Sequence, residues 1–115
     1  MILRKKQECF ALMVTDLIRE AFRQGFTVTL GEAWRPPEMC AIYAKKAIGI
    51  KESLHEERLA IDLNLFKDGK WLMETEDHRP LGEWWELQST AEIKTAWGGR
   101  FGDGCHYSVT HGGKK

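Results

Sequence analysis

Two histidines and two acids have the residue types and spacing of a metal site with a general base. His55 precedes Asp62 by seven residues, and Asp103 precedes His106 by three. A set of His, Asp and His supplies three ligands to a tetrahedral zinc ion and leaves the fourth position for water. Zinc lowers the pKa of such water to about 7, and Asp103 is the candidate base that takes its proton. The pattern predicts a hydrolytic site.

The spacing of His55 and Asp62 alone is weak evidence, because short patterns of this kind arise by chance. Without the second histidine, the two residues are better interpreted as a loop histidine and a solvated carboxylate. Cys105 is a competing ligand, because a thiolate binds zinc well. Neighbouring residues on a strand point to opposite faces, so we favour His106 over Cys105.

The two remaining histidines are weaker candidates. His78 lies in an acidic, polar segment, and we expect it to be exposed. His111 lies five residues after His106 and would bind the metal only if the terminal tail folds back. The predicted ligands are therefore His55, Asp62 and His106.

Hydrophobic periodicity predicts the elements that must position these residues. Apolar residues at helical spacing indicate helices over 7–24, 38–48 and 79–87. Apolar and polar residues alternate over 59–65, which predicts a strand whose leucines face the core and whose Asp62 faces away. We expect further strands over 26–30 and 105–109, a hairpin at Asp68-Gly69, and a frayed tail over 111–115.

The composition is that of a water-soluble domain, and we expect residues 1–115 to form one. Lys plus Arg equals Asp plus Glu at 17 each, so no overall basic surface favours nucleic acid or an anionic membrane. A local basic patch remains possible. We expect no signal peptide and no stable membrane insertion, since the apolar stretch over 10–14 is short. The odd set Cys9, Cys40 and Cys105 indicates reduced thiols in a protein made in the cytoplasm.

The motifs SLHEERLAIDL and WGGRFGDGCHYS resemble the zinc D-Ala-D-Ala carboxypeptidase and L-alanyl-D-glutamate endopeptidase family, which includes small phage endolysins. The run Gly82-Glu83-Trp84-Trp85 is also similar to family sequences, and the resemblance spans most of the chain. His55, Asp62, Asp103 and His106 match the positions of the family's site. Arg58 departs from the family pattern, because many relatives carry glycine there.

The resemblance implies an α+β fold of the DD-peptidase or hedgehog-like kind. Helices would cover one side of a small antiparallel sheet, with zinc on the other, polar face. The resemblance also implies that Arg35 binds the scissile carbonyl or a substrate carboxylate. It further implies that Ser53 supports the loop that carries His55. Without the resemblance, Arg35 could equally stack on Trp34 at the surface.

Adjacent tryptophans on a helix cannot face the same way, so we expect one of Trp84 and Trp85 in the core. The other, which we take to be Trp84, would line the substrate groove, although core filling is the simpler role for either.

The function implied is hydrolysis of peptidoglycan stem peptides, without a covalent intermediate, by a monomer that acts on the cell wall after release. Asp at position 103 favours cleavage between L-Ala and D-Glu. The alternatives are a D-Ala-D-Ala carboxypeptidase or dipeptidase, and a non-catalytic zinc module that binds wall peptides. A plain structural domain without metal would require the whole His, Asp, Asp, His arrangement to be accidental.

Overall fold

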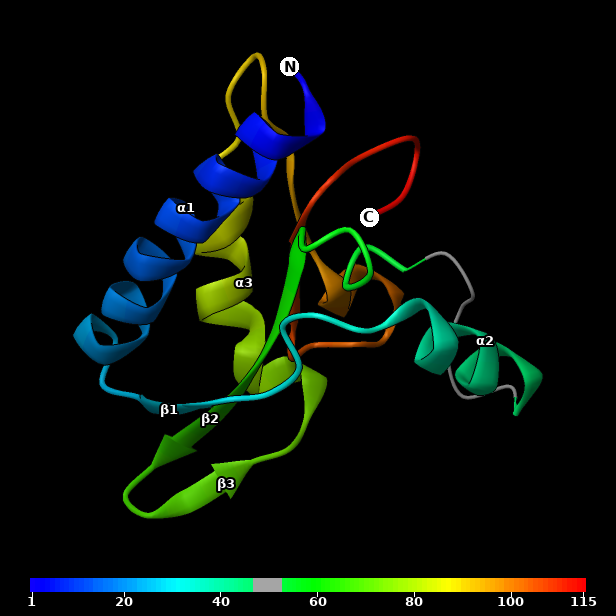
Figure 1. Cartoon of the computed structure of the whole chain (residues 1–115). Coiled ribbons are helices and arrows are strands. Elements are labelled where there is room, and N and C mark those ends of the chain that lie inside the picture. Colours follow the sequence, from blue (N-terminus) through cyan, green and yellow to red (C-terminus); the bar gives the residue numbers. More distant parts are fainter. Residues whose placement is uncertain (47–52) are drawn as a thin grey trace.

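The computed structural model describes residues 1–46 and 53–115, in which helices pack on a small antiparallel sheet (Figure 1). The strands are β1 (Thr27–Leu30), β2 (Ala60–Lys67), β3 (Lys70–Leu72), β4 (Thr95–Trp97) and β5 (His106–Val109). Their order is β1-β2-β5-β4, with β3 paired to β2, and every pairing is antiparallel. The predicted α+β class is confirmed.

Of the three α-helices in the described residues, two pack together on one side of the sheet. α1 (Leu3–Arg23) contacts α3 (Arg79–Glu86), and Figure 1 shows both on the same side of β2. α2 (Pro37–Lys45) lies apart from them, against the expectation that all helices share one side. The helix follows a Pro36-Pro37 corner and buries only Cys40, so it has little apolar surface to pack against the sheet.

The core lies between the sheet and the pair α1 and α3. Leu63 and Leu65 of β2 are fully buried in one cluster with Leu17 of α1 and Trp85 of α3. The Trp85 indole donates a hydrogen bond of 3.0 Å to the Ser108 carbonyl of β5, so its one polar atom is satisfied inside the core. This hydrogen bond joins α3 to β5 within the core.

β2 is the strand on which the predicted site depends. Its leucines face the core, so the residues between them, including Asp62, face the opposite side of the sheet. In the register, Asp62 is directly opposite His106 of β5. Directly opposite residues of an antiparallel pair project from the same face with Cβ atoms about 5 Å apart. Strand pairing thus brings two of the predicted ligands together.

Several boundaries and environments differ from the sequence prediction. α1 begins at Leu3 rather than at residue 7, because the intervening residues are good helix formers. The predicted helix over 38–48 ends at Lys45, and residues 47 and 48 lie outside the described residues. Strand β4 was not predicted, since three residues are too few to show alternation. The tail was expected to fray, but His111 and Lys114 form a β-bridge.

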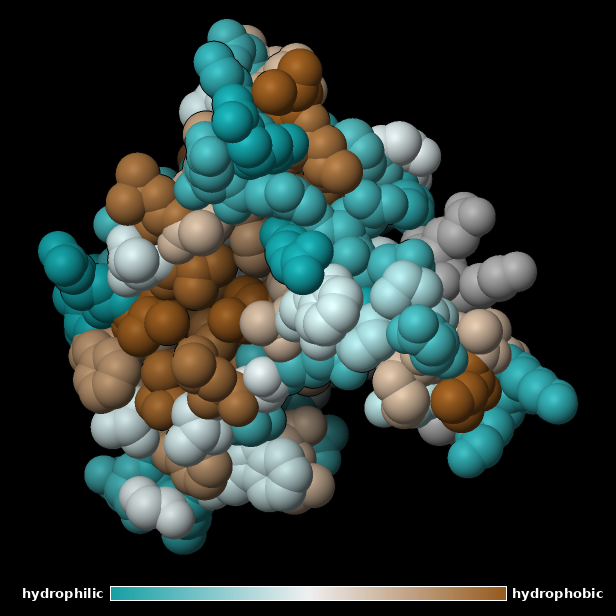
Figure 2. Space-filling model, viewed as in Figure 1, coloured by the Kyte–Doolittle hydropathy of each residue, from teal (hydrophilic) through white to brown (hydrophobic). Residues whose placement is uncertain are grey.

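The face in view carries an exposed hydrophobic patch between α1 and β2 (Figure 2). A depression of about 380 Å³ lies between these elements and is lined by Phe10, Val14, Trp34 and Ile61 among others. The depression borders α1, whereas Asp62 faces away from this helix.

Within residues 1–46 and 53–115, no helix is both long enough and apolar enough to cross a membrane.

Candidate metal centre

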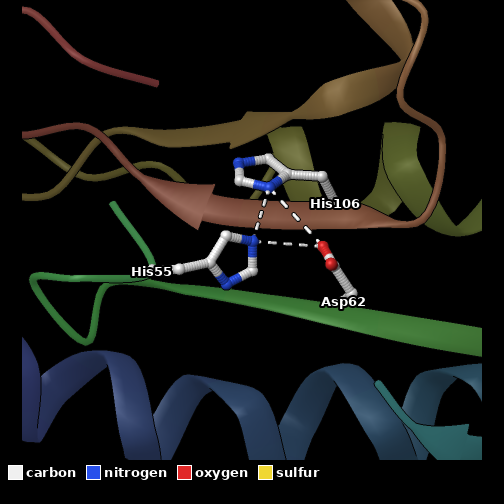
Figure 3. A group of neighbouring side chains, drawn as sticks. All are labelled: His55, Asp62 and His106. Carbon is white, nitrogen blue, oxygen red and sulfur yellow. Dashed lines mark hydrogen bonds and ion pairs between the residues drawn. The ribbon is translucent and has the colours of Figure 1, made fainter. Parts of the chain in front are cut away.

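His55, Asp62 and His106 converge on one point on the face of the sheet opposite α1 (Figure 3). His55 Nε2 lies 3.3 Å from Asp62 Oδ1 and 3.3 Å from His106 Nδ1. His106 Nδ1 lies 3.6 Å from Asp62 Oδ1. Both histidines are buried, and the Asp62 side chain is 25% exposed. The three residues could therefore hold a metal ion that remains accessible from one side.

The spacing of these atoms fits tetrahedral coordination. Ligand bonds of 2.0–2.1 Å at tetrahedral angles place neighbouring ligand atoms about 3.3 Å apart. The observed separations of 3.3, 3.3 and 3.6 Å are close to that value. Asp62 Oδ1 is buried and has no hydrogen-bond partner among the described residues. A buried carboxylate oxygen without a hydrogen bond is costly, and a bound cation would offset the cost.

Hydrogen bonds to the backbone fix the turn that carries His55. Ser53 Oγ is buried and accepts the His55 N–H at 3.1 Å. The His55 carbonyl accepts the N–H groups of Arg35 and Arg58, each at 3.2 Å. The His55 ring nitrogen Nδ1 lies 3.3 Å from the Ala33 carbonyl, which leaves Nε2 directed at Asp62 and His106. Ser53 thus holds the backbone of the turn that carries His55.

Arg58 takes a backbone conformation that glycine adopts readily. Its φ is 57°, in the left-handed region, which costs a residue with a side chain about 1–2 kcal/mol. The Arg58 guanidinium lies 4.5 Å from the centre of the Trp34 ring, a cation–π contact that offsets part of this cost. The Trp34 indole in turn donates to the Glu56 carbonyl at 3.2 Å. These contacts hold the loop in this conformation.

Asp62 is held by a continuation of the β1–β2 pairing beyond the end of β1. Its N–H donates to the Glu32 carbonyl, and its carbonyl accepts the Gly31 N–H, both at 2.8 Å. A Cβ atom on Gly31 would lie 2.8 Å from the Asp62 carbonyl oxygen and 3.0 Å from Asp62 Cβ. Glycine is therefore required for this close approach.

A tight turn ahead of β5 positions His106. The Asp103 N–H donates to the Gly98 carbonyl at 2.8 Å, and the His106 N–H donates to the Asp103 carbonyl at 3.1 Å. A Cβ atom on Gly98 would lie 2.2 Å from the Asp103 carbonyl oxygen and 2.7 Å from His106 Cβ. The Asp103 side chain is exposed and is not one of the three converging residues.

Cys105 is not one of the three converging residues. Its thiol donates to Asp103 Oδ1 at 3.4 Å. Burial, together with the carboxylates of Asp62 and Asp103, raises the pKa of Cys105 to about 12. The thiol is therefore protonated near neutral pH, whereas His106 is one of the three residues that could hold an ion.

The charges within the group reinforce one another. Burial alone would raise the pKa of Asp62, but the adjacent His106 and His55 rings lower it to about 2. Burial would likewise lower the pKa of His55, but Asp62 raises it above its usual value. Asp62 is thus ionised at neutral pH and available as an anionic ligand.

Glu32 is a residue of this centre that the sequence interpretation missed. Its Oε1 lies 2.7 Å from Arg35 Nε and 3.7 Å from His55 Nδ1, so one carboxylate contacts both side chains. The Arg35 side chain is only 13% exposed and also lies over the Tyr43 ring. The signal that could have revealed Glu32 is an acid three residues before the arginine, on the same side of the turn.

The structure does not bring Trp84 to the three converging residues. Trp84 packs against the core and lines a depression with Asp16, Arg19 and Gln88, between α1 and α3. His78, expected to be exposed, is buried, and its Nδ1 lies within hydrogen-bond distance of the Tyr107 hydroxyl, at 2.8 Å.

His111 lies near Lys6 rather than with the metal group. Its Nδ1 is 3.2 Å from Lys6 Nζ, and it does not belong to the converging set.

No protein-family model matches this chain, and no curated protein matches it either. The assignment of a function therefore rests on the site itself and on the sequence motifs.

Proposed function

We propose that this chain is a zinc peptidase that hydrolyses peptidoglycan stem peptides. The observation that carries the proposal is the convergence of His55 Nε2, Asp62 Oδ1 and His106 Nδ1 within 3.6 Å of one another. Three protein ligands with an open fourth position are typical of catalytic zinc sites, whereas structural zinc sites use four. An exposed carboxylate, Asp103, lies on the turn that leads into His106.

The donor set favours zinc over magnesium and calcium. Two imidazoles exclude the all-oxygen coordination that magnesium and calcium prefer. When bound, zinc would lower the pKa of a water molecule and polarise the carbonyl of the substrate. His55 and His106 would serve as neutral ligands and Asp62 as the charged one.

The chain's own residues would carry the proton and orient the peptide. Asp103 would take a proton from the attacking water and pass it to the leaving amine. Arg35 has five N–H donors, and its contacts with Glu32 use Nε and Nη2. Its remaining donors would bind the scissile carbonyl or a substrate carboxylate. Glu32 would hold the guanidinium in position while it does so.

The substrate class rests on the resemblance of the two sequence motifs to peptidoglycan peptidases. Within that resemblance, Asp at position 103 favours the bond between L-Ala and D-Glu, and the protein would act as a phage-type endolysin. The alternative is a D-Ala-D-Ala carboxypeptidase. The protein would be made in the cytoplasm as a monomer and reach the wall after release.

The test is digestion of purified peptidoglycan by the wild type and by Asp103→Ala, with products identified by mass spectrometry and bound zinc measured in each. We expect cleavage by the wild type only, with zinc retained in both proteins. Release of terminal D-Ala would identify the carboxypeptidase. Zinc without cleavage in the wild type would instead support a non-catalytic module that binds wall peptides.

A further inference from the structure

A second cluster of charged side chains lies where the first turns of α1 contact the C-terminal segment. A depression of about 450 Å³ is lined by Lys6, Lys94, Thr110, His111, Lys114 and Lys115, with two glycines of the turn. We call this the C-terminal basic pocket. Figure 1 shows both ends of the chain near this part of the molecule. The pocket shares no residue with the metal centre.

Lys6 is fixed in this pocket by contacts across the whole length of the sequence. Its Nζ donates to the Thr110 carbonyl at 3.2 Å and lies 3.2 Å from His111 Nδ1. An ammonium group has three donors and no acceptor, so Nδ1 of His111 must accept and Nε2 must carry the hydrogen. Lys6 keeps its third N–H, and His111 keeps its Nε2–H, as donors for a ligand.

The backbone around the pocket is also ordered by hydrogen bonds. His111 and Lys114 exchange two backbone hydrogen bonds of 3.1 and 2.9 Å, which close a turn. Gly112 and Gly113 inside the turn have φ values of 56° and 79°, a conformation that suits glycine. The Thr110 N–H donates to the Lys94 carbonyl at 2.8 Å, which ties this turn to the segment before β4.

The charges of the pocket are strongly unbalanced, although the chain as a whole is neutral. Four lysines line it, and the one ion pair found for them in the described part of the chain joins Lys114 Nζ to Glu57 Oε1 at 3.7 Å. Like charges gathered in one depression repel one another. An anion bound among them would relieve that repulsion.

We propose that the C-terminal basic pocket binds a phosphate group. Its lining cations are lysines, which act as compact point charges, and it has no arginine among them to pair a planar carboxylate in two-point fashion. Affinity would therefore follow charge density, which favours a doubly charged phosphate over a singly charged carboxylate. The phosphate can belong to a soluble phosphate compound or to a lipid headgroup, and the same donors would bind either.

The test is titration of the full chain with inorganic phosphate at low ionic strength, monitored by amide NMR signals of the turn 111–114. The variant Lys94→Gln/Lys115→Gln removes two charges whose side chains are exposed. The control Lys45→Gln/Lys70→Gln removes two exposed lysines outside the pocket. We expect saturable shifts in the wild type and the control, and weaker binding in the variant by about fivefold per lysine removed.

Sodium acetate and lipid vesicles complete the experiment. Acetate at the same ionic strength should give much smaller shifts than phosphate. Retention on phosphatidylglycerol vesicles but not on phosphatidylcholine, lost in Lys94→Gln/Lys115→Gln only, would assign the phosphate to a lipid headgroup. Saturation by phosphate without retention on vesicles would assign a soluble phosphate. Absence of saturable shifts, or equal weakening in the control, overturns the proposal, and neither readout depends on metal or on peptide cleavage.

Discussion

His55 Nε2 and His106 Nδ1 lie 3.3 Å apart, although the two residues are separated by 51 positions in the sequence. One ring comes from a turn before β2 and the other from the first residue of β5. Both rings direct a nitrogen toward the Asp62 carboxylate, which is the arrangement expected of ligands around one ion. The fold therefore supplies a preformed site.

The first prediction distinguishes His106 from its neighbour as a ligand. His106→Ala should lose bound zinc, because two ligands hold the ion far less tightly than three. Cys105→Ser should keep it, since the thiol lies against Asp103 and outside the converging set. His111→Ala serves as a matched control, because it removes a histidine that contacts Lys6 instead. Zinc retained in His106→Ala but lost in Cys105→Ser would show that the ligand assignment is wrong.

The second prediction concerns Asp103 as the general base. Asp103→Asn keeps the size of the side chain and removes its charge, so zinc content should not change. Peptide cleavage should fall by about 10²–10⁴-fold, the usual contribution of general acid–base catalysis. Asp68→Asn, at an exposed hairpin turn, is the control and should cleave normally. Full activity in Asp103→Asn would remove this residue from the mechanism.

The third prediction concerns Glu32. Its carboxylate lies against both Arg35 and His55, so Glu32→Gln should loosen both side chains. Loss of an outer carboxylate typically weakens metal affinity about 10–100-fold. Competition with a zinc chelator measures this change, and Glu38→Gln on the exposed start of α2 should show none. Unchanged zinc affinity in Glu32→Gln would show that Glu32 contributes to packing and not to metal binding.

The fourth prediction follows from the buried His78. Burial lowers the pKa of His78 below its usual value of 6.5, while the nearby Asp77 and Asp103 oppose the shift only in part. His78 is therefore protonated near pH 6.5 in the unfolded chain but only at lower pH in the folded chain. Because protonation favours the unfolded chain, the stabilisation present above pH 6.5 is lost on acidification.

Urea unfolding of the wild type and His78→Gln, both without metal, tests this between pH 7.5 and 5.5. The free energy of unfolding of the wild type should exceed that of His78→Gln at pH 7.5. The difference between the two proteins should shrink as the pH falls. A difference in the free energy of unfolding that stays constant or grows as the pH falls would contradict a lowered pKa for His78.

The fifth prediction concerns the turn before β5. Gly98→Ala places a Cβ atom 2.2 Å from the Asp103 carbonyl oxygen, so the turn must open. We expect the free energy of unfolding to fall by about 1–3 kcal/mol and zinc affinity to fall with it. Ala91→Ser, at an exposed position before β4, should leave both quantities unchanged in thermal unfolding and chelator competition.

The sequence predicts best the features that depend on local pattern. Alternation around Asp62 predicted both the strand and the face on which its carboxylate lies, and this is confirmed by β2. Helical spacing likewise located α1 and α3. Both features follow from the positions of apolar residues along one element, so they need no knowledge of the rest of the fold.

Features that depend on long-range packing were not predictable in this way. His78 was expected to be exposed because its neighbours in sequence are polar, but the partner that buries it is Tyr107, 29 residues away. Glu32 acquires its role only because the turn at Arg35 brings it to His55. The ordered tail depends in the same way on contact between Lys6 and His111. In each case a tertiary contact overrides the local pattern.

The most direct test of the central claim is the zinc content of the purified chain, measured together with peptidoglycan cleavage before and after removal of the metal. The account predicts about one zinc per chain, loss of cleavage on chelation and recovery when zinc is restored. It also predicts that His55→Ala neither holds zinc nor recovers. Cleavage that continues in the fully chelated protein, or a wild type that binds no zinc, would contradict the assignment of His55, Asp62 and His106 as a catalytic zinc centre.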